Sequence, residues 1–123
     1  MKLLIVDDSE RVRGLIKRLV GGLCEEILEW ADGEAAVAAY NEFHPDWVFM
    51  DIRMKKVDGL EATRQIMTAH RDARVIIITK YDDTRIRETA CAVGACGYVL
   101  KEDLSVLREM LAAAPGPVAA GQQ

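Results

Sequence analysis

The stretch that decides the fold is LLIVDD, residues 3–8. Four apolar residues, two of them β-branched, run directly into two adjacent carboxylates. The apolar run is typical of a buried strand. Packing alone does not explain the paired acids at its end. Asp7 and Asp8 could cap the following helix, be solvated by chance, or bind a cation.

Four further apolar runs resemble this strand, and helical periodicity separates them. The predicted strands are residues 3–6, 27–30, 47–50, 75–78 and 98–100. The helical stripes cover residues 12–23, 36–43, 60–67, 86–93 and 104–111. Ser9, Asp58 and Asp103 are the predicted N-caps, and Gly21 with Gly22 ends the first helix. Because Ser9 is a cap, both acids before it are expected to stay free.

Strand and helix therefore alternate five times. The strands are apolar at nearly every position rather than at alternate ones, which predicts a parallel sheet covered by helices on both faces. The expected architecture is an open α/β sandwich. In such a sheet, ligands bind beyond the carboxyl ends of the strands, where the strand order reverses.

Composition narrows the class of protein. The chain has 123 residues and a net charge of −4, which suits one domain without a basic surface for nucleic acid. The N-terminus resembles neither a signal peptide nor a membrane span, which predicts a cytoplasmic domain without membrane contact. Three cysteines without a CxxC pair predict small buried side chains rather than disulfides or a zinc site.

Polar residues follow four of the five predicted strands. They are Asp7, Asp8, Asp51, Thr79 and Lys101. Carboxylates about 4 Å apart repel by ~4 kcal/mol at an effective dielectric of about 20, so a cation must offset them. Magnesium suits a site of few carboxylates with room for water and a phosphate oxygen. Asp51 is then both a candidate ligand and a candidate nucleophile for phosphoryl transfer.

These residues carry a family resemblance. In order, LIVDD, VFMDIRM followed by VDG, IIITK and GACGYVLK resemble the receiver domain of two-component response regulators, over residues 1–112. The resemblance implies the CheY-like fold, a flavodoxin-like three-layer α/β sandwich. Its doubly wound, five-stranded parallel sheet has the order 2-1-3-4-5 and carries five helices. Residues 113–123 are expected to form a flexible tail or the start of an interdomain linker.

The resemblance also implies a phosphoacceptor site. Asp51 would carry an aspartyl phosphate, which makes the domain a signalling phosphoacceptor rather than an enzyme. Magnesium would be held by Asp8, Asp51 and the backbone carbonyl of Arg53. Asp7 would act mainly through water.

A switch and its partners are implied in the same way. Thr79 would hydrogen-bond the phosphoryl group, Lys101 would pair with it, and Tyr98 would rotate inward as the aromatic switch. The fourth helix, fifth strand and fifth helix would form the readout face, which would also serve a homodimer. The phosphodonor would be a sensor histidine kinase or a phosphotransfer protein. Features such as the lack of a proline after Lys101 resemble receivers attached to helix-turn-helix transcription factors.

Two positions depart from the family pattern. Lys55 stands where the family usually has proline, and its looser loop is expected to leave the site intact. Lys80 stands where a small residue is usual. It could screen the phosphoryl group, obstruct attacking water, or point into solvent, of which the last is favoured. Our hypothesis is that Lys80 changes the lifetime of the phosphorylated state.

Other functions fit less well. A flavin-binding protein needs a phosphate-cradling loop after the first strand, but DDSER repels phosphate. An aspartate-dependent phosphatase needs a second acid two residues after Asp51, and Arg53 stands there. The remaining alternative is a degenerate receiver that acts as a phosphorylation-independent interaction module.

Overall fold

The computed structural model describes residues 1–54 and 56–113. Five parallel strands pair in the order β2-β1-β3-β4-β5. Their bounds are β1 (Lys2–Val6), β2 (Glu26–Trp30), β3 (Trp47–Asp51), β4 (Val75–Thr79) and β5 (Gly97–Leu100). The helices are α1 (Glu10–Val20), α2 (Gly33–Phe43), α3 (Gly59–Ala69), α4 (Thr84–Ala92) and α5 (Val106–Ala113), with a 3₁₀ turn η1 (Lys101–Asp103) before α5. The predicted fold class and strand order are confirmed.

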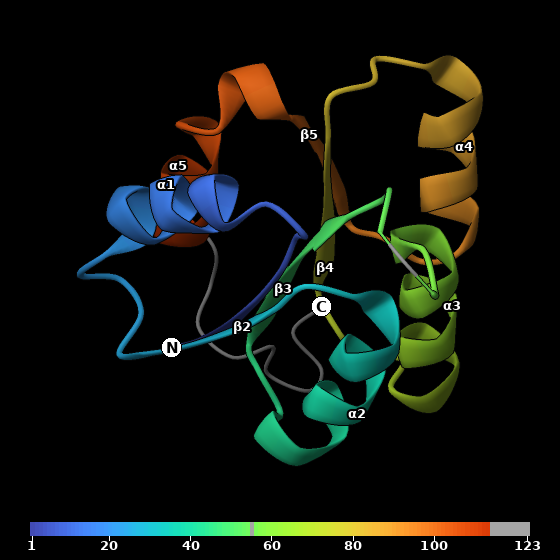
Figure 1. Ribbon diagram of the computed structural model, residues 1–123, viewed down its shortest axis with the longest axis horizontal. Coiled ribbons are helices and arrows are strands. Elements are labelled where there is room, and N and C mark those ends of the chain that lie inside the picture. The colour runs from blue at the N-terminus through green and yellow to red at the C-terminus, as the bar shows by residue number, and fades with distance from the viewer. Residues whose placement is uncertain (55, 114–123) are drawn as a thin grey trace.

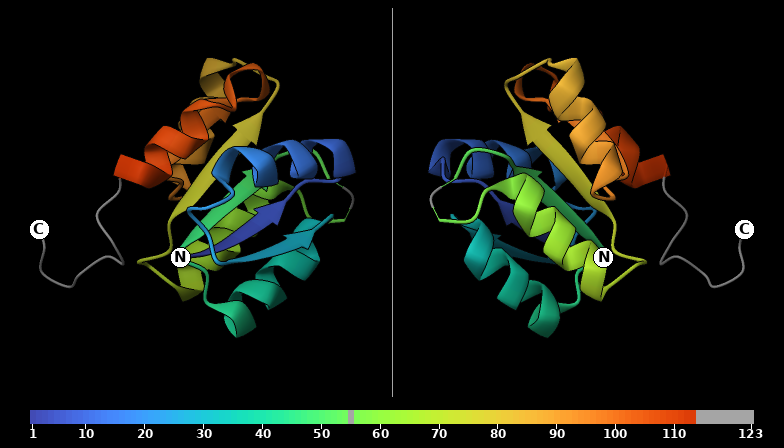
Figure 2. Two further views of the ribbon diagram at one scale, coloured as in Figure 1. Left: turned by 90° about the vertical axis from the view of Figure 1, so that its left-hand side faces the viewer. Right: turned by 90° about the vertical axis from the view of Figure 1, so that its right-hand side faces the viewer.

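Two layers of helices cover the sheet. Helices α1 and α5 lie on one face, and α2, α3 and α4 lie on the other (Figures 1 and 2). In β1, Leu3 and Ile5 pack with α1 and α5, whereas Leu4 and Val6 pack with the other three helices. All four are buried, which explains the continuous apolar run.

None of the described helices is both long and apolar enough to cross a bilayer.

Side-chain caps begin four of the helices. The residues whose side chains accept a first-turn N–H are Ser9, Asp32, Asp58 and Asp83. The predictions for Ser9 and Asp58 are therefore confirmed. The predicted cap at Asp103 is wrong, because this residue belongs to η1 and α5 begins only at Val106.

Three smaller expectations differ from the structure. Leu23 lies outside α1, because the helix ends at Val20. Cys91 and Cys96 are exposed rather than buried, and Cys24 is only partly buried. Residue 113 is the last residue of α5 rather than part of a tail. The expectations for Lys55 and for residues 114–123 lie outside the described residues.

Gly59 begins α3 at a close approach to the end of β3. Its N–H donates to the Ile52 carbonyl at 2.8 Å. A Cβ built on Gly59 would lie 1.8 Å from the carbonyl oxygen of Asp51. No side chain fits there, so the glycine of VDG lets α3 pack directly behind the strand end that carries Asp51.

We expect Gly59→Ala to lower the free energy of unfolding by more than about 3 kcal/mol, because backbone atoms must move to admit the methyl group. Gly14, inside α1, is the matched control, since nothing lies within 4 Å of a Cβ built there. Gly14→Ala should raise stability by about 0.5–1 kcal/mol through helix propensity. Urea unfolding measures both, and equal effects would contradict the close approach.

Candidate functional site

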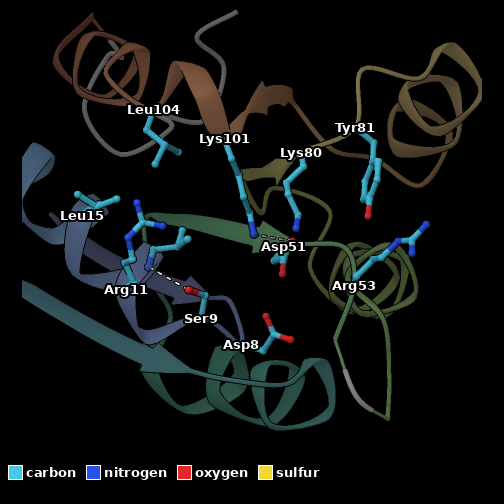
Figure 3. A pocket seen from close by; sticks show the side chains of 11 residues that line it. Asp8, Ser9, Arg11, Leu15, Asp51, Arg53, Lys80, Tyr81, Lys101 and Leu104 are labelled. Atoms are coloured by element: carbon cyan, nitrogen blue, oxygen red, sulfur yellow. Dashed lines mark hydrogen bonds and ion pairs between the residues drawn. The ribbon is translucent and has the colours of Figure 1, made fainter.

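Strand register brings the predicted acids together at the carboxyl edge of the sheet. Strands β1 and β3 pair Val6 with Met50, so the next residues, Asp7 and Asp51, come side by side. Lys101 follows β5 at the same edge. Figure 3 shows its ammonium group directed at Asp51. The topology therefore assembles a site from residues that lie far apart in the sequence.

Three carboxylates share this site with one ammonium group. One carboxylate oxygen from each of Asp7, Asp8 and Asp51 lies within 4.8 Å of the other two. Asp7 is 1% exposed and Asp51 is 6% exposed, whereas Asp8 is open to solvent. Lys101 Nζ lies 3.0 Å from Asp7 Oδ2 and 3.3 Å from Asp51 Oδ1. With all four groups ionised, three negative charges against one positive leave a net charge of −2.

Burial and the neighbouring negative charge both act on the pKa of Asp51. Burial, and then the charge of Asp7, raise the pKa of Asp51 from 3.8 to about 6. Lys101 and the Ile52 N–H, which donates to Oδ1 at 2.9 Å, oppose this shift without cancelling it. Burial lowers the pKa of Lys101, but the two carboxylates more than offset that effect and raise it above its ordinary value. Lys101 therefore stays charged, and the site still favours another cation.

Asp7 is engaged, contrary to the expectation that both acids stay free. The Ser9 hydroxyl caps α1 by accepting the Val12 N–H, while the Ser9 N–H donates to Asp7 Oδ1 at 2.8 Å. Arg13 also donates to the backbone carbonyl of Asp7, at 2.6 Å. These contacts fix the Asp7 carboxylate beside Lys101 and leave Asp8 as the accessible acid.

The donor set fits a hard divalent cation. Asp7 Oδ2 is buried and accepts no hydrogen bond from the described residues, although the Lys101 ammonium group lies 3.0 Å away. Figure 3 shows the Asp8 carboxylate turned toward Asp51. Oxygen ligands with one side open to water are the environment that Mg²⁺ prefers in proteins. The acidic cluster therefore fits the expected magnesium site.

A cavity of about 440 Å³ opens beside Asp51. Lys80 lies along the wall of this cavity while remaining exposed, so its side chain borders both the cavity and the solvent (Figure 3). Arg53 also lines the cavity, and its guanidinium stacks 4.5 Å from the centre of the Tyr81 ring. The cavity has room for a phosphoryl group within reach of cationic side chains.

The two predicted switch residues meet at Tyr81. Thr79 is buried, and its hydroxyl accepts the Tyr81 N–H at 3.1 Å. The Tyr98 hydroxyl donates to the Tyr81 carbonyl at 2.5 Å. Neither Thr79 nor Tyr98 is among the described residues that line the cavity at Asp51. Sequence reasoning missed Tyr81, although it lies only two residues after Thr79, the last residue of β4.

Comparison with known proteins places this chain in a family. The family model described as response regulator receiver domain matches residues 3–112. The transcriptional regulatory protein DegU of Brevibacillus brevis is 35% identical over 104 residues, which cover 83% of this chain and 44% of DegU. The chemotaxis protein CheY of Halobacterium salinarum is 37% identical over 100 residues, which cover 81% of this chain and 83% of CheY. The chain thus spans less than half of DegU but most of CheY.

Solved structures share the fold. A two-component response regulator of the LuxR family from Aurantimonas sp. SI85-9A1 superposes with a TM-score of 0.81 at 33% identity, covering 90% of this chain and 84% of that one. A chain of the CheX-CheY-BeF3-Mg+2 complex from Borrelia burgdorferi superposes with a TM-score of 0.82 at 28% identity, covering 94% of this chain and 90% of that one.

We expect Asp51→Asn to raise the free energy of unfolding by about 1–3 kcal/mol near pH 7.5 without divalent cations, because each unit of raised pKa costs about 1.4 kcal/mol. Above its pKa of about 6, Asp51 is ionised in the folded state. Burial and repulsion by Asp7 then destabilise the folded protein. The difference should shrink as the pH falls through about 6 toward 4, where the folded wild type already holds the proton. Urea unfolding in EDTA at several pH values measures this.

The exposed Asp72 provides the control for this measurement. Asp72→Asn should change the free energy of unfolding by less than about 0.5 kcal/mol at every pH. Added Mg²⁺ should stabilise the wild type more than Asp51→Asn, since the cation relieves the repulsion. A wild type as stable as Asp51→Asn at neutral pH in EDTA would contradict the raised pKa of Asp51.

Proposed function

Because this chain belongs to the response regulator receiver domains, a family of phosphoacceptor signalling modules, we propose that Asp51 accepts a phosphoryl group from a phosphohistidine. The observation that carries the proposal is the buried Asp51 between two further acids and Lys101. The donor is a sensor histidine kinase or a phosphotransfer protein. His44 and His70, the two histidines of the sequence, lie against each other at the ends of α2 and α3, and neither lines the cavity at Asp51.

Asp51 supplies the nucleophile without a general base. At neutral pH a carboxyl with a pKa of about 6 is mostly ionised. Ile52 N–H and Lys101 both contact Oδ1, which makes Oδ2 the attacking oxygen. A bond forms between Oδ2 and phosphorus while the phosphorus–nitrogen bond of the donor breaks, and the imidazole nitrogen takes the electron pair.

A bound cation and Lys101 would offset the negative charge of the acids and of the phosphoryl group. Asp8, Asp51 and the backbone carbonyl of Arg53 would hold Mg²⁺, with Asp7 acting through water. When bound, the ion neutralises charge between the acids and the phosphoryl oxygens. Lys101, 3.3 Å from Asp51, pairs with the transferred group and keeps its contact with Asp7.

Phosphorylation then biases two conformations with different affinity for a partner. Thr79 moves to the phosphoryl group and gives up the Tyr81 N–H that it accepts at rest. Tyr98 then changes its position, which alters the face made by α4, β5 and α5. That face is where we place the output contact, including contact with a second copy of the chain.

We propose that the output of this receiver is control of a DNA-binding domain. DegU is named as a transcriptional regulatory protein, and this chain spans less than half of it. CheY is named as a chemotaxis protein and matches over most of its length. The run GYVLK without a following proline supports the first kind of output. A phosphorylation-independent interaction module is less well supported, because Asp7, Asp51 and Lys101 keep contacts that such a module does not need.

Phosphorylation itself tests the proposal. Incubated with Mg²⁺ and a small phosphodonor, the wild type should gain the mass of one phosphoryl group, and Asp51→Asn should gain none. Intact mass spectrometry measures both, and EDTA should suppress the gain. A wild type that takes up no phosphoryl group, or an Asp51→Asn variant that takes up as much, rules out Asp51 as the acceptor.

Substitution of Lys80 tests whether this residue affects the lifetime of the phosphorylated state. Since its side chain lies along the cavity wall, we propose that it obstructs the water that attacks the aspartyl phosphate. Lys80→Ala should speed spontaneous dephosphorylation severalfold, whereas Lys80→Met, which keeps the length without the charge, should stay close to the wild type. Equal rates for the wild type and Lys80→Ala would remove Lys80 from any role in the lifetime.

A further inference from the structure

Tyr98 is held from two sides. Its hydroxyl donates to the Tyr81 carbonyl, and the Arg87 guanidinium lies over its ring, 4.3 Å from the centroid. Tyr98 is only partly buried, so packing against the core does not confine the ring by itself. Arg87 therefore covers ring surface that the core leaves open, and α4 is tied to β5 through this contact.

Arg87 is itself oriented by Asp82. The two side chains form an ion pair at 3.1 Å. They are 48% and 71% exposed, so the ion pair by itself adds little stability. Its effect is directional, because Asp82 restricts the guanidinium and keeps its planar face on Tyr98. A lysine could supply the same charge but not the same stacked plane.

Tyr81 links this arrangement to the cavity. Its N–H donates to the Thr79 hydroxyl, and its ring lies beneath the guanidinium of Arg53, which lines the cavity at Asp51. A shift of Thr79 toward a phosphoryl group removes the acceptor of the Tyr81 N–H. The shift of Thr79 therefore affects Tyr81, whose carbonyl accepts the hydrogen bond from the Tyr98 hydroxyl.

We infer that Arg87, oriented by Asp82, is a positioning residue that keeps Tyr98 bonded to the Tyr81 carbonyl before any phosphoryl group is present. The inference rests on the proposed function, and it takes the position of Tyr98 bonded to the Tyr81 carbonyl as the inward position of the switch. Arg87 then favours activation, because less conformational change remains to be driven by phosphorylation. A cation–π contact at a partly exposed site corresponds to a factor of about two to five in an equilibrium.

The position of Tyr98 can be measured without phosphorylation. The chain has three tyrosines, so the Tyr98 ring can be followed by NMR, together with its proximity to Tyr81. Arg87→Ala should shift the Tyr98 ring signals and weaken that proximity, and Asp82→Asn should cause a smaller change of the same kind. Arg85→Ala, which removes an equal charge from an exposed site on the same helix, should leave the ring unchanged. Unchanged Tyr98 signals in Arg87→Ala overturn the inference.

A double-mutant cycle measures the consequence for activation. Arg87→Ala should slow phosphorylation by a small phosphodonor by about two- to fivefold. In a Tyr98→Leu background it should have no further effect, because Arg87 acts through Tyr98. An equal slowing in both backgrounds, or faster phosphorylation of Arg87→Ala, overturns the inference. A wild type that is not phosphorylated on Asp51 instead overturns the proposed function, while the NMR comparison still decides the role of Arg87.

Discussion

The contact of Lys101 with both Asp7 and Asp51 holds together a group of charges that would otherwise repel one another. Two of the carboxylates are buried, and the raised pKa of Asp51 shows that one ammonium group does not compensate for burial and repulsion. The sheet tolerates this cost because its apolar strands supply the stability elsewhere. A site with excess negative charge and oxygen ligands then responds strongly to a cation and to a phosphoryl group, since either one changes the balance of charge.

The site is connected to the surface through a short segment after β4. Thr79, Tyr81 and Tyr98 are joined by hydrogen bonds that use the two backbone groups of Tyr81. Arg53 covers the Tyr81 ring on the cavity side, and Arg87 covers the Tyr98 ring from α4. The cavity at Asp51 and the face made by α4 and β5 therefore share one residue, Tyr81, which lines the cavity and accepts the Tyr98 hydroxyl. This agrees with a signalling role better than with turnover of a substrate.

Most of the fold could be predicted from local pattern, and the failures have physical causes. Continuous apolar strands predicted a sheet covered on both faces, and the two helix layers confirm it. The cap at Asp103 was wrong because the residues after Lys101 form a 3₁₀ turn before α5 begins. Asp7 was expected to be free, but the chain turns back at Ser9 so that a backbone N–H reaches its carboxylate. Such contacts depend on loop geometry, which residue types alone do not specify.

The sequence by itself determined the alternation of strand and helix, and it placed an acid, a hydroxyl or an amine at the end of four strands. These features follow from periodicity and from the order of residues along the chain. Only the tertiary structure decided which of these groups touch, because register and crossover topology bring together residues distant in sequence. The same holds for Tyr81 and Arg87. The loop after β4 places the Tyr81 carbonyl against Tyr98, and α4 places the Arg87 guanidinium there, so no local pattern in the sequence predicts these contacts.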